Sequence, residues 1–255
     1  MIKKIKPKKK PWVCLTAYNK HIAEIIDPYC DMILVGDSMA MAYYGFKNTR
    51  SIGLSEIILH AKSVRMGVKK SIMVVDMPYN TYSTPSVALK NAKKILKETK
   101  CDAIKLEGGY KIKNIIKTLI KNRIQIVGHI GLMPQAVINS KDYKVKGKNS
   151  YEENKILKDF LTLQELGVKA VVIEAVKETI ANKIQSLSSI ITIGIGASKK
   201  CNGQILVTED LLGMFDFTPR FVKKYSNVKK TIQQAVSKYA KDVIERKFPK
   251  MKNVY

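Results

Sequence analysis

Four apolar, strand-like runs of this 255-residue chain each end on a carboxylate. The runs are MILVGD, IMVVD, AIKLE and VVIE, and they end at Asp37, Asp76, Glu107 and Glu174. Because parallel strands present their carboxyl ends at the same edge of a sheet or barrel, we expect these acids to converge on one site. Acids gathered in one pocket repel each other unless a cation lies among them. The pattern therefore predicts a metal-assisted enzyme.

Apolar β-runs alternate with helical segments along the whole chain, without a linker or an internal repeat. Continuous Val/Ile runs separated by helices predict a parallel sheet covered by helices. We expect strands at 12–18, 32–37, 72–78, 103–108, 124–131, 170–176, 190–196 and 221–225. Eight such units in a chain of this length favour one (β/α)8 TIM barrel over residues 1–255. A basic extension is expected at about residues 1–10.

The formal net charge of +25 raises the question of a nucleic-acid or membrane partner. Only five of the 46 basic residues are arginines, and the lysines are spread over the whole chain. Since phosphate and base recognition favour the arginine fork, no specific nucleic-acid binding is expected. The positive field would still attract anionic substrates. No apolar run is long enough to cross a bilayer, and the N-terminal residues do not resemble a signal peptide, so a cytoplasmic protein is expected.

Cysteine and histidine spacing argues against a zinc site or a disulfide framework. The four cysteines form no CxxC pair, so reduced and mostly buried thiols are expected. Cys201 is predicted to lie in a loop and to be the more exposed one. His21 and His60 are expected within helices, and neither has a second ligand at metal-binding spacing.

Each acidic motif also has a purely structural interpretation. Asp37 and Ser38 in VGDS would serve as turn or helix-cap residues, and Asp76 has the same alternative, weakened by Pro78 just beyond it. Lys105 and Glu107 lie two apart on one strand and face the same way, so they form either an ion pair or part of a pocket.

The remaining candidates lie on the later strands. His129 is either a core histidine or a pocket residue. Glu174, enclosed by apolar residues, is a candidate general base, with a lysine-held carboxylate as the alternative. The glycine-rich GIGAS at 194–198 would cradle an anion at a helix start, but it matches neither a dinucleotide fingerprint nor a P-loop.

Taken together, the motifs resemble the ketopantoate hydroxymethyltransferase family. The matching segments are VGDS, SIGLSEIILHAKSV, VVDMP, KLEGG, GHIGLMPQ, VIE and GIGASKKCNGQILV, and they span about residues 16–225. The resemblance implies a (β/α)8 barrel that transfers a hydroxymethyl group from 5,10-methylenetetrahydrofolate to 3-methyl-2-oxobutanoate. The product would be 2-dehydropantoate, in the first step of pantothenate biosynthesis. It also implies a cytoplasmic homo-oligomer, a decamer of two pentamers.

The same resemblance implies roles for individual residues. Asp37, Asp76 and Glu107 would bind Mg²⁺, and Glu174 would accept a proton from the substrate. The substrate would contact Asp37, Ser38, Asp76, Lys105 and His129. A magnesium-bound 2-oxo acid has a more acidic C3–H, and the enolate formed there would be stabilised by the metal and Lys105. The chain departs from the family pattern at Asn19, Ala61, Ser198 and Asn202, outside this set.

Three other functions fit parts of the same pattern. A metal-dependent aldolase or lyase of the pyruvate-binding barrels would also enolise a 2-oxo acid. A Schiff-base aldolase would use Lys105 as its nucleophile and would need no metal. A nucleic-acid-binding protein would use the basic surface, with weak and salt-sensitive binding.

Overall fold

The computed structural model describes residues 2–139 and 142–255. The chain forms two compact units, of which the first ends at Val207 and the second covers Thr208–Tyr255. Each unit is described by itself.

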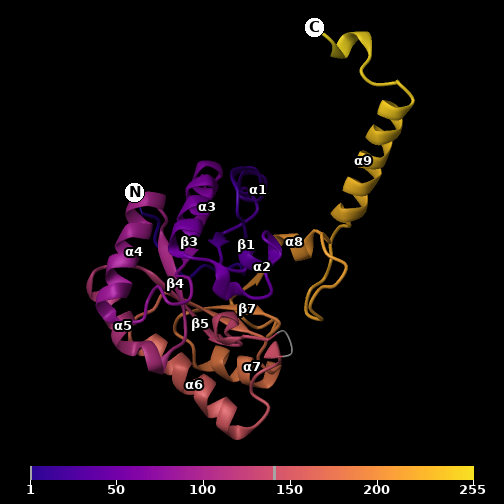
Figure 1. The fold of residues 1–255 in the computed structure, drawn as a ribbon. Coiled ribbons are helices and arrows are strands. Elements are labelled where there is room, and N and C mark those ends of the chain that lie inside the picture. Colours follow the sequence, from indigo (N-terminus) through magenta and orange to yellow (C-terminus); the bar gives the residue numbers. More distant parts are fainter. Residues whose placement is uncertain (1, 140–141) are drawn as a thin grey trace. The chain divides into compact units, whose positions relative to one another are not determined.

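Eight parallel strands of the first unit form a closed barrel in sequence order (Figure 1). They are β1 Trp12–Thr16, β2 Met32–Val35, β3 Ile72–Asp76, β4 Ala103–Glu107, β5 Ile126–Gly131, β6 Ala170–Glu174, β7 Ile191–Ile195 and β8 Gly203–Leu206. The barrel closes where β8 pairs with β1. The predicted eight-stranded barrel is thus confirmed.

Helices follow the strands and cover the outside of the barrel, as Figure 1 shows for α3 to α7. Their bounds are α1 Lys20–Ile26, α2 Met39–Ala42, α3 Leu54–Gly67, α4 Pro85–Thr99, α5 Lys113–Lys121, α6 Ser150–Glu165 and α7 Glu178–Leu187. α4 begins at Pro85, and the Thr84 side chain caps it by accepting a hydrogen bond from Val87 N. Asn19 caps α1 in the same way, so this departure from the family pattern still supplies a helix cap.

The core has two layers, which follow from the alternation of side chains along each strand. Inward-facing residues of the strands form one apolar cluster inside the barrel, together with Ile5 of the N-terminal segment. Outward-facing residues pack with the helices in a larger cluster. On β4, for example, Ala103 belongs to the inner cluster, while Ile104 and Leu106 belong to the outer one.

The predicted eighth strand at 221–225 was wrong. The eighth strand is Gly203–Leu206, and residues 221–225 lie outside regular structure. Phe221 and Val222 give the wrong segment more β-propensity than GQIL has, since glycine and glutamine are poor strand formers. Gly203 is nevertheless required there, because a Cβ would lie 2.4 Å from the Cβ of Trp12 on β1.

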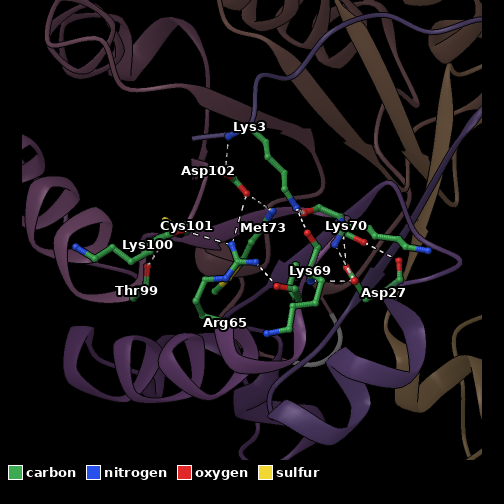
Figure 2. Close-up of polar contacts among 12 residues, drawn as sticks. Lys3, Asp27, Arg65, Lys69, Lys70, Met73, Thr99, Lys100, Cys101 and Asp102 are labelled. Carbon is green, nitrogen blue, oxygen red and sulfur yellow. Dashed lines mark hydrogen bonds and ion pairs between the residues drawn. The ribbon is translucent and has the colours of Figure 1, made fainter. Parts of the chain in front are cut away.

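The amino-terminal end of the barrel is closed by polar contacts and by residues of the basic extension (Figure 2). The Asp27 carboxylate accepts backbone N–H bonds from Lys69, Lys70 and Ser71 at 2.9, 2.8 and 2.8 Å. Asp102 accepts the backbone N–H groups of Lys3 and Met73 at 2.7 and 2.9 Å. The beginning of β3 is therefore fixed by two buried carboxylates.

The second unit contains α8 Thr208–Leu211 and α9 Val228–Ile244. No residue of α9 is buried, although its apolar side chains recur every three or four positions. Ile232, Val236, Tyr239 and Val243 are 45%, 59%, 57% and 43% exposed. Within the described residues, no helix is long and apolar enough to cross a membrane.

All four cysteines are free and buried. The prediction of reduced, buried thiols is confirmed for Cys14, Cys30 and Cys101. The expectation that Cys201 is more exposed was wrong, because this residue is only 5% exposed and packs with the outer cluster.

Candidate functional site

Five of the predicted site residues, Asp76, Lys105, Glu107, His129 and Glu174, meet at the carboxyl end of the barrel because they continue the inward-facing rows of the strands, while Asp37 and Ser38 follow β2 in its loop. Val74, Ala103, Val127 and Val172 belong to the inner apolar cluster. The inward position two residues further along each strand is occupied by Asp76, Lys105, His129 and Glu174. Register places Asp76 beside Lys105 and Glu107 beside His129 on neighbouring strands. The barrel interior thus changes from apolar to charged at this end.

Asp76 and Lys105 form a buried ion pair, with Lys105 Nζ 2.6 Å from Asp76 Oδ1. Burial raises the pKa of Asp76 even though the Lys105 ammonium opposes it. For Lys105, burial would lower the pKa, but the charges of Asp76, Asp37 and Glu107 outweigh it and raise the pKa. The amine is therefore protonated at neutral pH.

The structural alternative for Lys105 was a pair with Glu107, and the structure corrects that partner to Asp76. Side chains two apart on a strand are separated by about 6.5 Å, whereas registered neighbours on adjacent strands are about 4.8 Å apart. The cross-strand pair is therefore the closer one.

Asp37 is 3% exposed and lies against both Asp76 and the loop after β5. Its backbone N–H donates to Asp76 Oδ2 at 3.1 Å, and its own Oδ2 accepts a bond from Gln135 Nε2 at 2.7 Å. Burial and the neighbouring charges of Asp76 and Glu107 raise the pKa of Asp37 well above its ordinary value. The three acids are thus close enough to destabilise each other's charge.

Ser38 begins α2, but its side chain does not cap that helix. Instead its hydroxyl lies 2.9 Å from the hydroxyl of the buried Tyr18. The helix-cap interpretation therefore does not account for this serine.

His129 lies between two carboxylates. Its Nδ1 is 3.4 Å from Glu107 Oε1 and its Nε2 is 3.1 Å from Glu174 Oε2. Neither contact meets the geometry of a hydrogen bond, so within the described part of the chain both nitrogens and Glu107 Oε1 are buried polar atoms without a hydrogen-bond partner. Burial and the Lys105 charge would lower the pKa of His129, but Glu107 and Glu174 outweigh them and raise it to about 9.

Glu174 is not fully enclosed, contrary to the expectation from its apolar sequence neighbours. Its side chain is 15% exposed, because Glu174 is the last residue of β6 and extends beyond the packed interior.

His60 was expected away from the strand ends, and it lies on α3, where its Nδ1 is 2.6 Å from the carbonyl oxygen of Tyr18.

Ser198 and Asn202 have structural partners in the loop that begins in GIGAS. The Ser198 hydroxyl donates to Asn182 Oδ1 at 2.6 Å and accepts from Lys200 N at 3.1 Å. Asn202 Oδ1 accepts the backbone N–H of Thr192 at 3.0 Å, so it retains the acceptor oxygen that an aspartate would supply. The predicted anion cradle in this loop stays a prediction.

Sequence reasoning missed Gln135, which bonds two of the acids, and Tyr82, which bonds Gln135. Gln135 follows β5 and is 4% exposed. Tyr82 donates to Gln135 Oε1 at 2.5 Å. The available signal was the position of MPQ just beyond a strand that carries His129.

The donor atoms fit a hard divalent cation in kind, because they are carboxylate oxygens whose charges repel each other. Among the residues that the structure describes, Glu107 Oε1 is a buried oxygen without a hydrogen-bond partner, as expected for a ligand atom. Asp76 is occupied by Lys105 Nζ, and Asp37 accepts a hydrogen bond from Gln135 Nε2. Among the described residues, no group of three His, Cys, Asp or Glu side chains is arranged to hold a metal ion.

A (β/α)8 barrel with charged residues at the carboxyl ends of its strands defines a barrel enzyme with its active site at that end. The profile of the family described as ketopantoate hydroxymethyltransferase matches residues 1–251. The chain belongs to the ketopantoate hydroxymethyltransferase family.

Curated relatives agree over nearly the whole chain. A 3-methyl-2-oxobutanoate hydroxymethyltransferase of Pelagibacter ubique is 52% identical over 250 residues, covering 98% of this chain and 96% of the relative. The enzyme of the same name from Rhizobium etli is 48% identical, covering 94% and 89%. That from Helicobacter pylori is 45% identical, covering 93% and 88%.

Solved structures with low identity share the fold. A phosphonopyruvate hydrolase in complex with oxalate and Mg²⁺ superposes with a TM-score of 0.62 at 9% identity, covering 95% of this chain and 88% of that one. A 2,3-dimethylmalate lyase of the PEP mutase/isocitrate lyase superfamily gives 0.61 at 11%, covering 91% and 83%. These likenesses concern the barrel alone.

Proposed function

We propose that this enzyme transfers a hydroxymethyl group from 5,10-methylenetetrahydrofolate to 3-methyl-2-oxobutanoate, forming 2-dehydropantoate with the help of Mg²⁺. The observation that carries the proposal is the ring of charged side chains at the barrel mouth, in which Lys105 and His129 lie among four carboxylates. Membership of the hydroxymethyltransferase family supports the choice of substrates.

Asp37, Asp76 and Glu107 would hold the Mg²⁺. The support is their mutual repulsion and Glu107 Oε1, which has no hydrogen-bond partner among the described residues. When bound, Mg²⁺ would supply Lewis-acid polarisation of the keto acid.

Glu174 is the residue best placed to accept the C3 proton of the keto acid. Its carboxylate is partly exposed at the mouth, so a substrate can reach it, and His129 Nε2 lies 3.1 Å away. His129 would thus line the pocket and orient the base.

Lys105 and Ser38 would contact the anionic substrate. The Lys105 ammonium would stabilise negative charge that develops on the keto acid as the proton leaves. A Schiff-base mechanism is disfavoured because it requires a neutral amine, whereas Lys105 is held in a 2.6 Å ion pair.

The proposal is tested in two assays on the same preparations. The first follows deuterium exchange at C3 of 3-methyl-2-oxobutanoate, and the second follows folate-dependent formation of 2-dehydropantoate, each with Mg²⁺ and with EDTA. We expect both to require Mg²⁺, and we expect Asp76→Ala and Glu174→Gln to lose both. Glu165→Gln, an exposed position on α6, serves as the control.

Two outcomes would contradict the assignment. Substantial metal-independent turnover by Asp76→Ala would count against the metal site. Exchange at C3 without any folate-dependent product would indicate an aldolase or lyase of the pyruvate-binding barrels instead.

We propose further that the enzyme is a cytoplasmic homo-oligomer, with a decamer as the expected state. The exposed apolar stripe of α9, Ile232, Val236, Tyr239 and Val243, supports self-association, since such stripes are usually buried. Light scattering coupled to size exclusion measures the state, and a monomer at micromolar concentration would contradict the proposal. The assignment of residues 1–255 to one catalytic domain stays a prediction, as does the absence of specific nucleic-acid binding.

A further inference from the structure

Gln135 enters the acidic site because the chain turns back sharply after β5. Gly131 has a φ of +92°, and a Cβ at that position would lie 2.4 Å from the carbonyl oxygen of Glu174. Leu132 N donates to that same carbonyl at 2.8 Å. Pro134 then opens the short 3₁₀ turn η3, Pro134–Ala136. The turn places Gln135 over the ends of β2, β3 and β4.

The contacts of Gln135 join three strand ends. Its backbone N–H donates to Glu107 Oε2 at 3.0 Å. Its side-chain Nε2 donates to Asp37 Oδ2 at 2.7 Å and to the carbonyl oxygen of Met77 at 2.9 Å. One residue therefore holds carboxylates from β4 and from the loop after β2, which otherwise repel each other.

The partners fix the orientation of the Gln135 amide. The Asp37 carboxylate and the Met77 carbonyl only accept, so both must face the amide NH₂ group. The amide oxygen accepts from the Tyr82 hydroxyl at 2.5 Å. Tyr82 thus locks the amide that orients Asp37.

We propose that Gln135 is a positioning residue that holds Asp37 and Glu107 ready for the divalent cation, and that Tyr82 fixes its orientation. Glu107 Oε2 is held by the Gln135 backbone, which leaves Oε1 as the buried oxygen without a hydrogen-bond partner. Fixing both acids before binding lowers the cost of bringing like charges together around the ion. This inference rests on the metal site of the proposed function.

The test is a titration of the purified full-length protein with Mn²⁺, with free Mn²⁺ followed by electron paramagnetic resonance. Gln135→Met keeps the length of the side chain and the backbone bond to Glu107, but it removes the amide. We expect its Kd for Mn²⁺ to rise about 10- to 100-fold, the range found for residues that orient metal ligands. Tyr82→Phe removes only one hydroxyl, and we expect a smaller rise of several-fold.

Tyr79→Phe is the matched control, because it also removes a single tyrosine hydroxyl, and the Tyr79 ring stacks with the Arg50 guanidinium. We expect this variant to bind Mn²⁺ like the wild type. Melting of the metal-free proteins shows whether an effect is structural, since a positioning role raises Kd without a matching loss of stability.

The outcomes separate the inference from the proposed function. Wild-type Kd values in Gln135→Met, or in Tyr82→Phe if the first variant does not fold, would overturn the inference while leaving the metal site intact. A wild-type protein that does not bind Mn²⁺ would overturn the metal site, and the inference with it.

Discussion

Replacing Asp27 by Asn isolates one buried carboxylate at the closed end of the barrel, shown in Figure 2. Asp27 is 4% exposed and accepts three backbone N–H bonds, two on Oδ2 and one on Oδ1. Asn retains a single oxygen, and its NH₂ group would face an N–H donor. If that oxygen takes the place of Oδ2, Lys69 and Lys70 keep neutral bonds, and Ser71 N is left without an acceptor.

The expected loss follows from these bonds. A hydrogen bond to a charged group contributes about 1.5–3 kcal/mol, and one between neutral groups contributes about 1 kcal/mol. Weakening two bonds and losing the third gives a destabilisation of about 3–5 kcal/mol. We expect to measure this loss in the free energy of unfolding by urea denaturation at neutral pH and fixed protein concentration. Glu24→Gln, an exposed position on the same helix α1, is the control and should change stability by less than about 0.5 kcal/mol.

The pH dependence provides an independent check. Burial alone would raise the pKa of Asp27, but the N–H donors of Ser71, Lys70 and Lys69 outweigh it, and the pKa is lowered. A carboxylate with a lowered folded-state pKa stabilises the fold above its unfolded value of about 3.9, and this contribution is lost as the pH falls through the folded value. The difference in the free energy of unfolding between wild type and Asp27→Asn should therefore be constant from pH 5 to 8, a range that begins about one unit above the unfolded pKa. The difference should shrink in stronger acid. A loss below about 1 kcal/mol at neutral pH, or one that persists unchanged in strong acid, would refute the reasoning.

Three further predictions concern other parts of the molecule. Ile5→Ala should lower stability by about 2–4 kcal/mol in urea unfolding, because Ile5 is 5% exposed within the inner cluster. The variant should keep the KM of the wild type. Wild-type stability would show that the N-terminal segment does not seal the barrel. Lys105→Met should abolish activity, and it should destabilise the metal-free protein by about 3–5 kcal/mol because Asp76 loses its partner. Adding Asp76→Asn should recover much of that stability, whereas additive losses would contradict the pairing. Burial raises the pKa of Glu209 to about 7, so the folded state binds this proton more tightly than the unfolded chain does. The stability of the protein should therefore decrease as the pH rises from the ordinary pKa of a glutamate toward 7. Thermal unfolding of Glu209→Gln should lack this pH dependence, and the same dependence in both proteins would contradict the prediction.

Most of the fold was predictable because the strands before β8 are apolar runs, and helices separate the strands from β1 to β7. Gly203–Leu206 was not, since four residues beginning with glycine carry little β signal and form a strand through pairing with β1 on one side and β7 on the other. The N-terminal contacts of Lys3 with Asp102 were also outside the reach of local patterns, because they join positions 99 apart.

The candidate site was predictable where a charged residue ends a strand, as for Asp76 and Glu107. Pairing within the site was less predictable, because the choice of Asp76 as the partner of Lys105 depends on barrel register. Gln135 lay beyond sequence reasoning for a similar reason. Its bond to Asp37 joins positions 98 apart, and only the backbone turn at Gly131 brings them together.

All proposed site residues lie on or directly after five consecutive strands, β2 to β6. The rim of the barrel is therefore divided between an arc that carries the chemistry and an arc that does not. Laboratory evolution that randomises the loop after β7, at residues 196–202, would spare the proposed metal ligands and proton-transfer groups. Such libraries should contain many active variants, whereas libraries that randomise the ends of β2 to β6 should contain mostly inactive ones.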